Sequence, residues 1–264
     1  MSTEREGDTD GIAGEPASDT AQYEPASIDD YERVFGRDFV SPGGAATARE
    51  LVERLDLPPG ARVLDAGAGL GGAAFLMARE RGFLVDGIDL SSEMVRRARA
   101  RAVELGLVER VAFERGDCLE LERPGRYDAV HSRDVFLHIA DKGRLFGVLR
   151  DALVPGGTLL LTDYCSGERP WSAGFVDYVA RRGYHLMTPE ALGAAIAGAG
   201  FESVRVEDLG ERFAALLERD LATIAALDVG AATRERLAAS WRGKLERARS
   251  GEHRWALVEA RAPG

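Results

Sequence analysis

The chain has 264 residues and 45% of them are hydrophobic, so it is long enough for one large domain with a sizeable core. Its formal net charge is −10, which argues against non-specific nucleic-acid binding, because that binding relies on basic patches. No apolar run is long enough to span a membrane, and the first residues lack the basic and apolar blocks of a secretion signal. We therefore expect a cytoplasmic protein with no nucleic-acid or membrane partner.

Residues 1–20 are mostly acidic or small and have no hydrophobic periodicity, which is typical of a disordered tail. The folded domain is expected to span residues 21–264. Cys118 and Cys165 are the only cysteines, and they lack the spacing of metal ligands. We expect two small buried residues in a reducing compartment, and no metal site.

The first part of the domain is expected to contain two helices, at 28–35 and 45–55, separated by a break at Ser41–Gly44. From about residue 61 to residue 164, short apolar runs alternate with helical segments. These runs predict strands near Val63, Val85, Val111, Ala129 and Leu160. Strands that are apolar throughout suit a parallel sheet covered by helices on both faces.

The last part of the chain returns to longer helical patterns. It predicts a helix at 189–199, a strand at 202–208, helices at about 211–226 and 231–250, and a strand at 254–260. The helical insertion between the last two strands, at about 209–252, is where we expect a substrate lid. The N-terminal helices within residues 21–56 are expected to complete that lid.

A glycine-rich turn joins the first predicted strand to a helix. The sequence Val63-Leu-Asp-Ala-Gly-Ala-Gly-Leu-Gly-Gly72 is followed by a second strand that ends in Asp89. Gly67 and Gly69 let the backbone approach a ligand closely, and the helix N-terminus offers free N–H groups. An acid about twenty residues on can accept hydrogen bonds from ribose hydroxyls. This pattern predicts a nucleotide-cofactor site, which a nicotinamide dehydrogenase would also contain.

Further acids narrow the choice of cofactor. Asp65 precedes the glycines, Asp117 follows the third predicted strand, and the turn Leu153-Val-Pro-Gly-Gly157 leads into a strand at 158–162. This succession resembles the class I S-adenosylmethionine (SAM) methyltransferases. The resemblance implies an α/β, Rossmann-like fold with a seven-stranded, mostly parallel sheet, helices on both faces and a helical lid. It also implies SAM as cofactor, with Asp89 at the ribose and Asp117 at the adenine amino group.

A second, more specific set of residues points to the substrate. It comprises Gln22-Tyr23, Tyr31–Gly36, Phe39–Gly44, His131–His138, Leu161–Cys165, Tyr178–Tyr184 and Trp241–Lys244. Taken in order, these segments resemble the phosphoethanolamine N-methyltransferases, which make phosphocholine by three successive methylations. The resemblance extends from about Gln22 to the C-terminus. It implies a monomeric enzyme whose partner is a small phosphobase.

The resemblance assigns roles to individual residues. A dyad of Tyr23 and His138 closes the site and assists deprotonation of the amine. The residues expected at the cofactor are Tyr31, Val40, Ser41, Asp65, Gly67, Gly69, Asp89, Leu90, Asp117, Cys118 and Arg133. Those expected at the substrate are Gln22, Asp134, Tyr164, Tyr178, Arg182, Tyr184 and Lys244. The chemistry fits, because guanidinium and ammonium groups suit a phosphate and acid with aromatic surface suits a quaternary ammonium.

Ordinary structural roles compete with these assignments. Asp134 would also serve as a helix cap, and Tyr178 and Arg182, four residues apart, would also form one solvated face of a helix. Lys244 would serve as a solvated surface charge. For His131, His185 and His253 we expect only packing or solvent exposure.

Two other functions remain open at this point. One is SAM-dependent methylation of another small amine, such as a glycine derivative or a secondary metabolite. The other is a regulatory protein that binds the cofactor without turnover.

Overall fold

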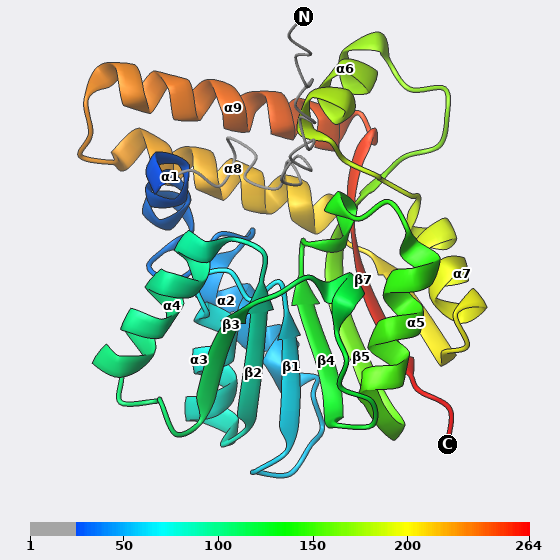
Figure 1. Ribbon diagram of the computed structural model, residues 1–264. Helices are drawn as coiled ribbons and strands as arrows, with labels where there is room; N and C mark the ends of the chain where they lie inside the picture. Colours follow the sequence, from blue (N-terminus) through cyan, green and yellow to red (C-terminus); the bar gives the residue numbers. More distant parts are fainter. Residues whose placement is uncertain (1–24) are drawn as a thin grey trace, which may run out of the picture.

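The computed structural model describes residues 25–264, and in that range one sheet runs through the centre of the molecule (Figure 1). Its strands are β1 (Arg62–Ala66), β2 (Leu84–Asp89), β3 (Val111–Arg115), β4 (Tyr127–Arg133), β5 (Leu153–Ser166), β6 (Glu202–Asp208) and β7 (His253–Arg261). The spatial order is β3-β2-β1-β4-β5-β7-β6. The first five strands of this order pair in parallel, and β7 runs antiparallel to β5 and β6. The expected seven-stranded, mostly parallel sheet is confirmed.

Helices connect the strands in the alternating manner expected from the sequence. They are α1 (Pro25–Phe35), α2 (Gly44–Glu53), α3 (Gly72–Leu76), α4 (Ser92–Glu104), α5 (Lys142–Ala152), α6 (Ala173–Arg182), α7 (Pro189–Gly198), α8 (Gly210–Ala226) and α9 (Ala231–Arg249). Short polar side chains begin several of them. Ser91 accepts a hydrogen bond from the backbone N–H of Met94 at the start of α4, and Asp141 accepts one from Arg144 at the start of α5.

The sheet separates two apolar cores. Successive residues of a strand point to opposite faces, so Val63 packs with the helices α2, α3 and α4, whereas its neighbour Leu64 packs with α5 and α7. This explains why the central strands are apolar throughout. The strand expected at residues 158–162 is longer than expected, because β5 already begins at Leu153. Its pairing with β4 is irregular near Gly156, whose φ of +73° lets the strand bulge and continue.

The carboxyl ends of the parallel strands all point to the same edge of the sheet. The insertion between β6 and β7 folds into the helix pair α8 and α9, and in Figure 1 this pair lies across that edge together with α1 and α6. In open α/β sheets, ligands bind outside the carboxyl ends of the strands. The fold therefore brings residues from distant parts of the sequence together over one edge.

Candidate active site

A cavity of about 440 Å³ opens over the carboxyl ends of β1, β2 and β4. Residues of α1, the loop before α2, α6 and α9 complete its walls. The cavity is lined by all expected site residues in the described range except Tyr178: Tyr31, Val40, Ser41, Asp65, Gly67, Gly69, Asp89, Leu90, Asp117, Cys118, Arg133, Asp134, His138, Tyr164, Arg182, Tyr184 and Lys244. Gln22 and Tyr23 lie outside the described residues.

The glycine-rich loop forms the floor of one end of the cavity. Gly67 and Gly69 have φ angles of +73° and +54°, which side chains rarely adopt. A Cβ on Gly67 would lie only 2.3 Å from Cγ2 of Val135. Glycine is therefore required at this position, and the bare backbone of the loop leaves room for a ligand.

Asp89 lies beside this loop at the end of β2. Its carboxylate accepts hydrogen bonds from the N–H groups of Gly69, at 2.8 Å, and Ser91, at 2.9 Å. Burial raises the pKa of Asp89, whereas these two N–H groups act in the opposite direction. Each carboxylate oxygen can accept a further hydrogen bond, so the group is oriented and still able to bind two hydroxyls.

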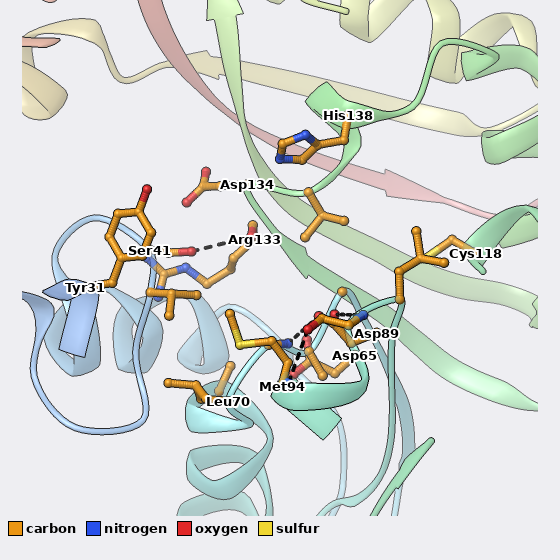
Figure 2. A pocket seen from close by; sticks show the side chains of 18 of the residues that line it. Tyr31, Ser41, Asp65, Leu70, Asp89, Met94, Cys118, Arg133, Asp134 and His138 are labelled. Atoms are coloured by element: carbon orange, nitrogen blue, oxygen red, sulfur yellow. Dashed lines mark hydrogen bonds between the residues drawn. The ribbon is translucent and has the colours of Figure 1, made fainter. Parts of the chain in front are cut away.

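The rest of this end is apolar with a few acids. Figure 2 shows Leu70 and Met94 on one side of Asp89, with Cys118 on the other. Burial raises the pKa of Cys118 to about 12, so its thiol is neutral. Asp117 caps a short 3₁₀ turn by accepting a hydrogen bond from Leu119 N–H at 2.8 Å. Apolar walls with acids at the edge suit a nucleoside.

Asp65 and His131 form a buried pair on adjacent strands. The carboxylate oxygen Oδ1 of Asp65 lies 2.7 Å from Nδ1 of His131, which is fully buried. The other oxygen of Asp65 has no hydrogen-bond partner among the described residues. Asp65 lines the cavity, so this oxygen is available to a donor such as the amino group of a ligand.

Arg133 attaches the loop before α2 to the sheet. Its guanidinium donates to the backbone oxygens of Pro42, at 2.7 Å, and Gly44, at 3.4 Å, and Ser41 Oγ donates to the backbone oxygen of Arg133 at 3.5 Å. Burial lowers the pKa of Arg133. The side chain thus holds the wall of the cavity in place as well as lining it.

Asp134 follows directly at the end of β4, with a positive φ of 58°. Its Oδ1 accepts hydrogen bonds from Trp255 Nε1 at 2.7 Å and Thr162 Oγ1 at 3.2 Å. Its Oδ2 is buried without a partner in the described part of the chain. The side chain does not cap the next helical turn, so the competing role as a helix cap is wrong. The structure instead fixes this carboxylate through hydrogen bonds to one of its oxygens.

His138 ends a short 3₁₀ turn just after Asp134, and Figure 2 places its imidazole above that carboxylate. Burial lowers the pKa of His138 to about 4, and the charges of Lys142 and Arg182 act in the same direction. The ring is therefore neutral at pH 7. It packs edge-on against Tyr184, with 5.2 Å between the ring centroids.

Lys142 fixes the turn that carries His138. This buried side chain donates from Nζ to three backbone oxygens: Phe136 at 2.6 Å, Ile139 at 2.5 Å and His185 at 3.1 Å. A further hydrogen bond joins His185 N–H to the oxygen of Leu137 at 2.7 Å. The turn before α5 and the loop after α6 are therefore held together, which sets the contact between His138 and Tyr184.

The far end of the cavity is basic and aromatic. Lys244 Nζ lies 3.5 Å from Tyr164 Oη and over the rings of Tyr164 and Trp241, at 5.2 Å and 5.7 Å. Burial lowers the pKa of Lys244 to about 8, and the charge of Arg182 adds to this effect. A side-chain hydrogen bond joins Arg182 to Tyr31. Lys244 is therefore no ordinary surface charge, and this end is suited to an anion.

Tyr178 lies one layer behind the lining. Its ring packs against Tyr184 and His253, each with 5.8 Å between centroids, and its hydroxyl is buried without a partner in residues 25–264. It is buried, so it does not belong to a solvated helix face.

Sequence reasoning missed several residues of the site. Leu70, Met94 and His131 line the cavity, and Arg247 and His253 pack behind its basic end. A signal existed for Met94, which lies one turn into the helix after Asp89. The roles of the others depend on which strands and helices become neighbours.

The comparisons with known proteins agree with this geometry. Residues 43–206 match the family model described as "Methyltransferase domain", so the chain is a methyltransferase-domain protein with the class I, Rossmann-like fold. It is 41% identical over 250 residues to phosphoethanolamine N-methyltransferase 3 of Arabidopsis thaliana, covering 92% of this chain and 51% of the relative. The phosphoethanolamine N-methyltransferase of Plasmodium falciparum is 34% identical over 201 residues, covering 75% of this chain and 74% of the relative. The chain belongs to the phosphoethanolamine N-methyltransferase family.

A solved structure supports the same relationship. Phosphoethanolamine N-methyltransferase 2 of Haemonchus contortus, in complex with phosphomonomethylethanolamine and S-adenosylhomocysteine, aligns with a TM-score of 0.88 and 33% identity. The alignment covers 92% of this chain and 58% of that one. The chain spans about half the length of the plant relatives it matches.

The described residues form neither a metal-binding cluster nor a membrane-spanning helix. No three His, Cys, Asp or Glu side chains in the range 25–264 gather in a way that would hold a metal ion. Among the helices of the same range, none is long and apolar enough to cross a membrane.

Proposed function

We propose that the chain transfers methyl groups from SAM to the nitrogen of phosphoethanolamine, stepwise to phosphocholine. The observation that carries this proposal is the separation of opposite charges within the cavity. One wall offers Asp134, whose Oδ2 has no partner among the described residues, and the far end offers Arg182 and Lys244. A phosphobase has a cationic amine at one end and a phosphate at the other, so it matches both. The Haemonchus relative solved with phosphomonomethylethanolamine supports the same substrate class.

The residues of the opposite end fit SAM. Asp89 would accept hydrogen bonds from the ribose hydroxyls, and Asp117 one from the adenine amino group. Leu70 and Met94 would pack on the adenine ring. The unpaired oxygen of Asp65 would receive the amino group of the methionine part. When bound, SAM supplies an electrophilic methyl group on a sulfonium sulfur.

The protein's own groups would prepare the amine for attack. Free phosphoethanolamine is mostly an ammonium ion at pH 7, so it must lose a proton before its nitrogen can form a bond to carbon. His138, with Tyr23 as its dyad partner, would assist removal of this proton. Its ring is neutral at that pH in the free protein. Asp134 would hold the nitrogen in line. Alignment and exclusion of water would supply much of the rate.

The helices α8 and α9, together with α1, would act as the lid. Lys244 on α9 and Tyr31 on α1 already line the cavity, so movement of these helices would close or open the substrate end. The described residues of a single chain line the cavity, which supports a monomer as the active form. Two free, buried cysteines suit a reducing compartment, and we place the enzyme in the cytoplasm.

Replacing Arg182 with alanine is expected to raise the Michaelis constant for phosphoethanolamine by roughly tenfold to a hundredfold, because a charge-assisted bond to phosphate is lost. Steady-state kinetics would measure this constant, and calorimetry would give the dissociation constant of SAM, which should change less than about twofold. The control is Arg181→Ala, which removes an exposed neighbour on the same helix. Equal Michaelis constants for Arg182→Ala and Arg181→Ala would contradict the phosphate assignment.

Lys244 should make phosphocholine binding sensitive to pH. Because the pKa of Lys244 lies near 8 in the free protein, its positive charge is present below that value and is lost as the pH rises. Phosphocholine has no titrating amine. Its dissociation constant, measured by calorimetry with S-adenosylhomocysteine present, should therefore rise by roughly tenfold from pH 7 to pH 9.5.

The matched variant for this experiment is Lys244→Arg. A guanidinium stays charged over the whole range, so the pH dependence should flatten. If the wild-type protein binds phosphocholine equally well at both pH values, Lys244 does not bind the phosphate.

The second candidate function is methylation of another small amine. It requires that the phosphate group contributes nothing to substrate binding. In that case choline and phosphocholine would bind with equal affinity. The two cations at the far end of the cavity favour the phosphorylated substrate.

A further inference from the structure

We propose that Arg247 is a positioning residue for the phosphate, and that it makes the basic end of the cavity prefer a doubly charged anion over a singly charged one. The inference rests on the proposed function and deepens it. Arg247 lies on α9, three residues after Lys244. Residues three apart share one face of a helix, so the two side chains leave α9 on the same side.

Arg247 contacts the substrate end through Tyr178. Its Cζ lies 3.8 Å from the centroid of the Tyr178 ring, which is the geometry of a stacked guanidinium. Cζ of Arg182 lies 5.9 Å from the same ring. A residue of α9 and a residue of α6 thus both place a guanidinium against Tyr178. Because Arg247 does not line the cavity, it would act through this ring and through its charge.

Several polar groups around this stack are buried and unpaired. Arg247 Nε, Tyr178 Oη and both ring nitrogens of His253 have no hydrogen-bond partner in the described residues. His253 is fully buried, and its ring lies 5.8 Å from that of Tyr178. Unpaired buried polar groups are costly and usually indicate a missing partner. The cluster combines residues of α6, α9 and β7. An anion with its bound waters would supply hydrogen-bond partners for these polar groups.

The other arginines of α9 have partners among the described residues. Arg236 pairs with Asp30, Arg242 with Glu235, and Arg249 with Glu218. Arg234 donates to the backbone oxygens of Leu227 and Val229. No carboxylate in residues 25–264 pairs with Arg247, although it is half-buried. An arginine kept inside without a carboxylate, next to Lys244, indicates that the charge is kept for a ligand.

This extra charge would matter most for a dianion. The positive charge of Arg247 is among the causes that lower the pKa of Lys244, so the two cations repel each other. A bound anion relieves that repulsion, and a second negative charge on the anion increases the gain. A phosphate monoester carries nearly two charges at pH 7.5, whereas a sulfate monoester of the same shape carries one.

The experiment compares two ligands of matched shape, phosphocholine and choline O-sulfate. Calorimetry at pH 7.5, with S-adenosylhomocysteine present, would measure both dissociation constants for the wild type and for Arg247→Met. We expect the variant to bind phosphocholine about tenfold more weakly and choline O-sulfate at most about threefold more weakly. Its turnover number at saturating phosphoethanolamine should be unchanged, because Arg247 does not touch the reacting atoms.

The controls separate charge from folding. Arg249→Met removes an exposed arginine of the same helix and should leave both constants unchanged. Arg247→Lys keeps the charge and should retain most of the preference for phosphocholine. If Arg247→Met does not fold, Arg247→Gln carries the same comparison.

The outcomes distinguish this inference from the proposed function. If the wild type binds phosphocholine and Arg247→Met weakens both ligands equally, or neither, the inference is overturned and the proposed function stands. If the wild type fails to bind phosphocholine at all, both are overturned.

Discussion

Replacing Asp89 with alanine is expected to weaken SAM binding by roughly a hundredfold to a thousandfold, because the proposed hydrogen bonds from two ribose hydroxyls to its carboxylate are lost. The same change leaves the N–H groups of Gly69 and Ser91 without their acceptor, because in the wild type both donate hydrogen bonds to this carboxylate. The glycine loop would lose its anchor together with the ligand contact. Calorimetric titration with S-adenosylhomocysteine would measure the effect without turnover.

Asp117, the other acid expected to bind the nucleoside part of the cofactor, provides a comparison with a smaller expected effect. Asp117→Asn removes the charge expected at the adenine amino group, and a weaker effect of about tenfold is expected there. Thermal unfolding without ligand would establish that both variants fold. An Asp89→Ala protein that binds S-adenosylhomocysteine within threefold of wild type would refute the assignment of this end to the cofactor.

Replacing His138 with alanine is expected to lower the turnover number for phosphoethanolamine by roughly a hundredfold or more, because the proposed proton acceptor is lost. The dissociation constant of SAM should stay nearly unchanged, since His138 lies above Asp134 and away from Asp89 in Figure 2. The Michaelis constant should change less than the turnover number, because the phosphate contacts remain. Single-turnover kinetics with saturating SAM would separate the chemical step from product release.

The proposed dyad adds a second requirement. Tyr23→Phe should lower the turnover number too, and the double variant should be no slower than the slower single variant, because groups that act as one unit are not additive. Independent, multiplicative losses would mean that Tyr23 and His138 do not act together. An unchanged turnover number in His138→Ala would exclude the imidazole as the proton acceptor.

The cofactor end could be predicted from the sequence because it is local. The strand, the glycine turn and Asp89 lie within 27 residues, from Val63 to Asp89. The closely spaced glycines directly indicate a turn with positive φ angles. The strands could also be predicted from the sequence, because strands that are buried on both faces need continuous apolar runs. Only the length of the strand expected at 158–162 was wrong, because pairing with β4 extends β5 back to Leu153 and pairing with β7 extends it on to Ser166.

The substrate end could not be derived in the same way. Asp134, Arg182 and Lys244 come from three separate parts of the chain, and only the resemblance to a family connected them. Periodicity and charge gave no sign that Lys244 lies in the cavity wall rather than in solvent. Three-dimensional packing of α9 on the edge of the sheet decides this.

The residues that were missed share a physical cause. The pair of Asp65 and His131 follows from the register of β1 and β4, in which the two residues are direct neighbours. Lys142 is buried because three backbone oxygens meet at one point. Arg247 differs from Arg249 only in the side of α9 on which it lies. Each case depends on which elements become neighbours, and the sequence pattern of one element does not contain that information.

The most direct test of the proposed function is mass spectrometry of the products formed by the purified protein from SAM and phosphoethanolamine, with ethanolamine and glycine in parallel reactions. The account predicts stepwise gains of one, two and three methyl groups on phosphoethanolamine and none on the other two amines. Methylation of ethanolamine or glycine, with no gain on phosphoethanolamine, would contradict the substrate assignment and leave the fold and the cofactor site in place.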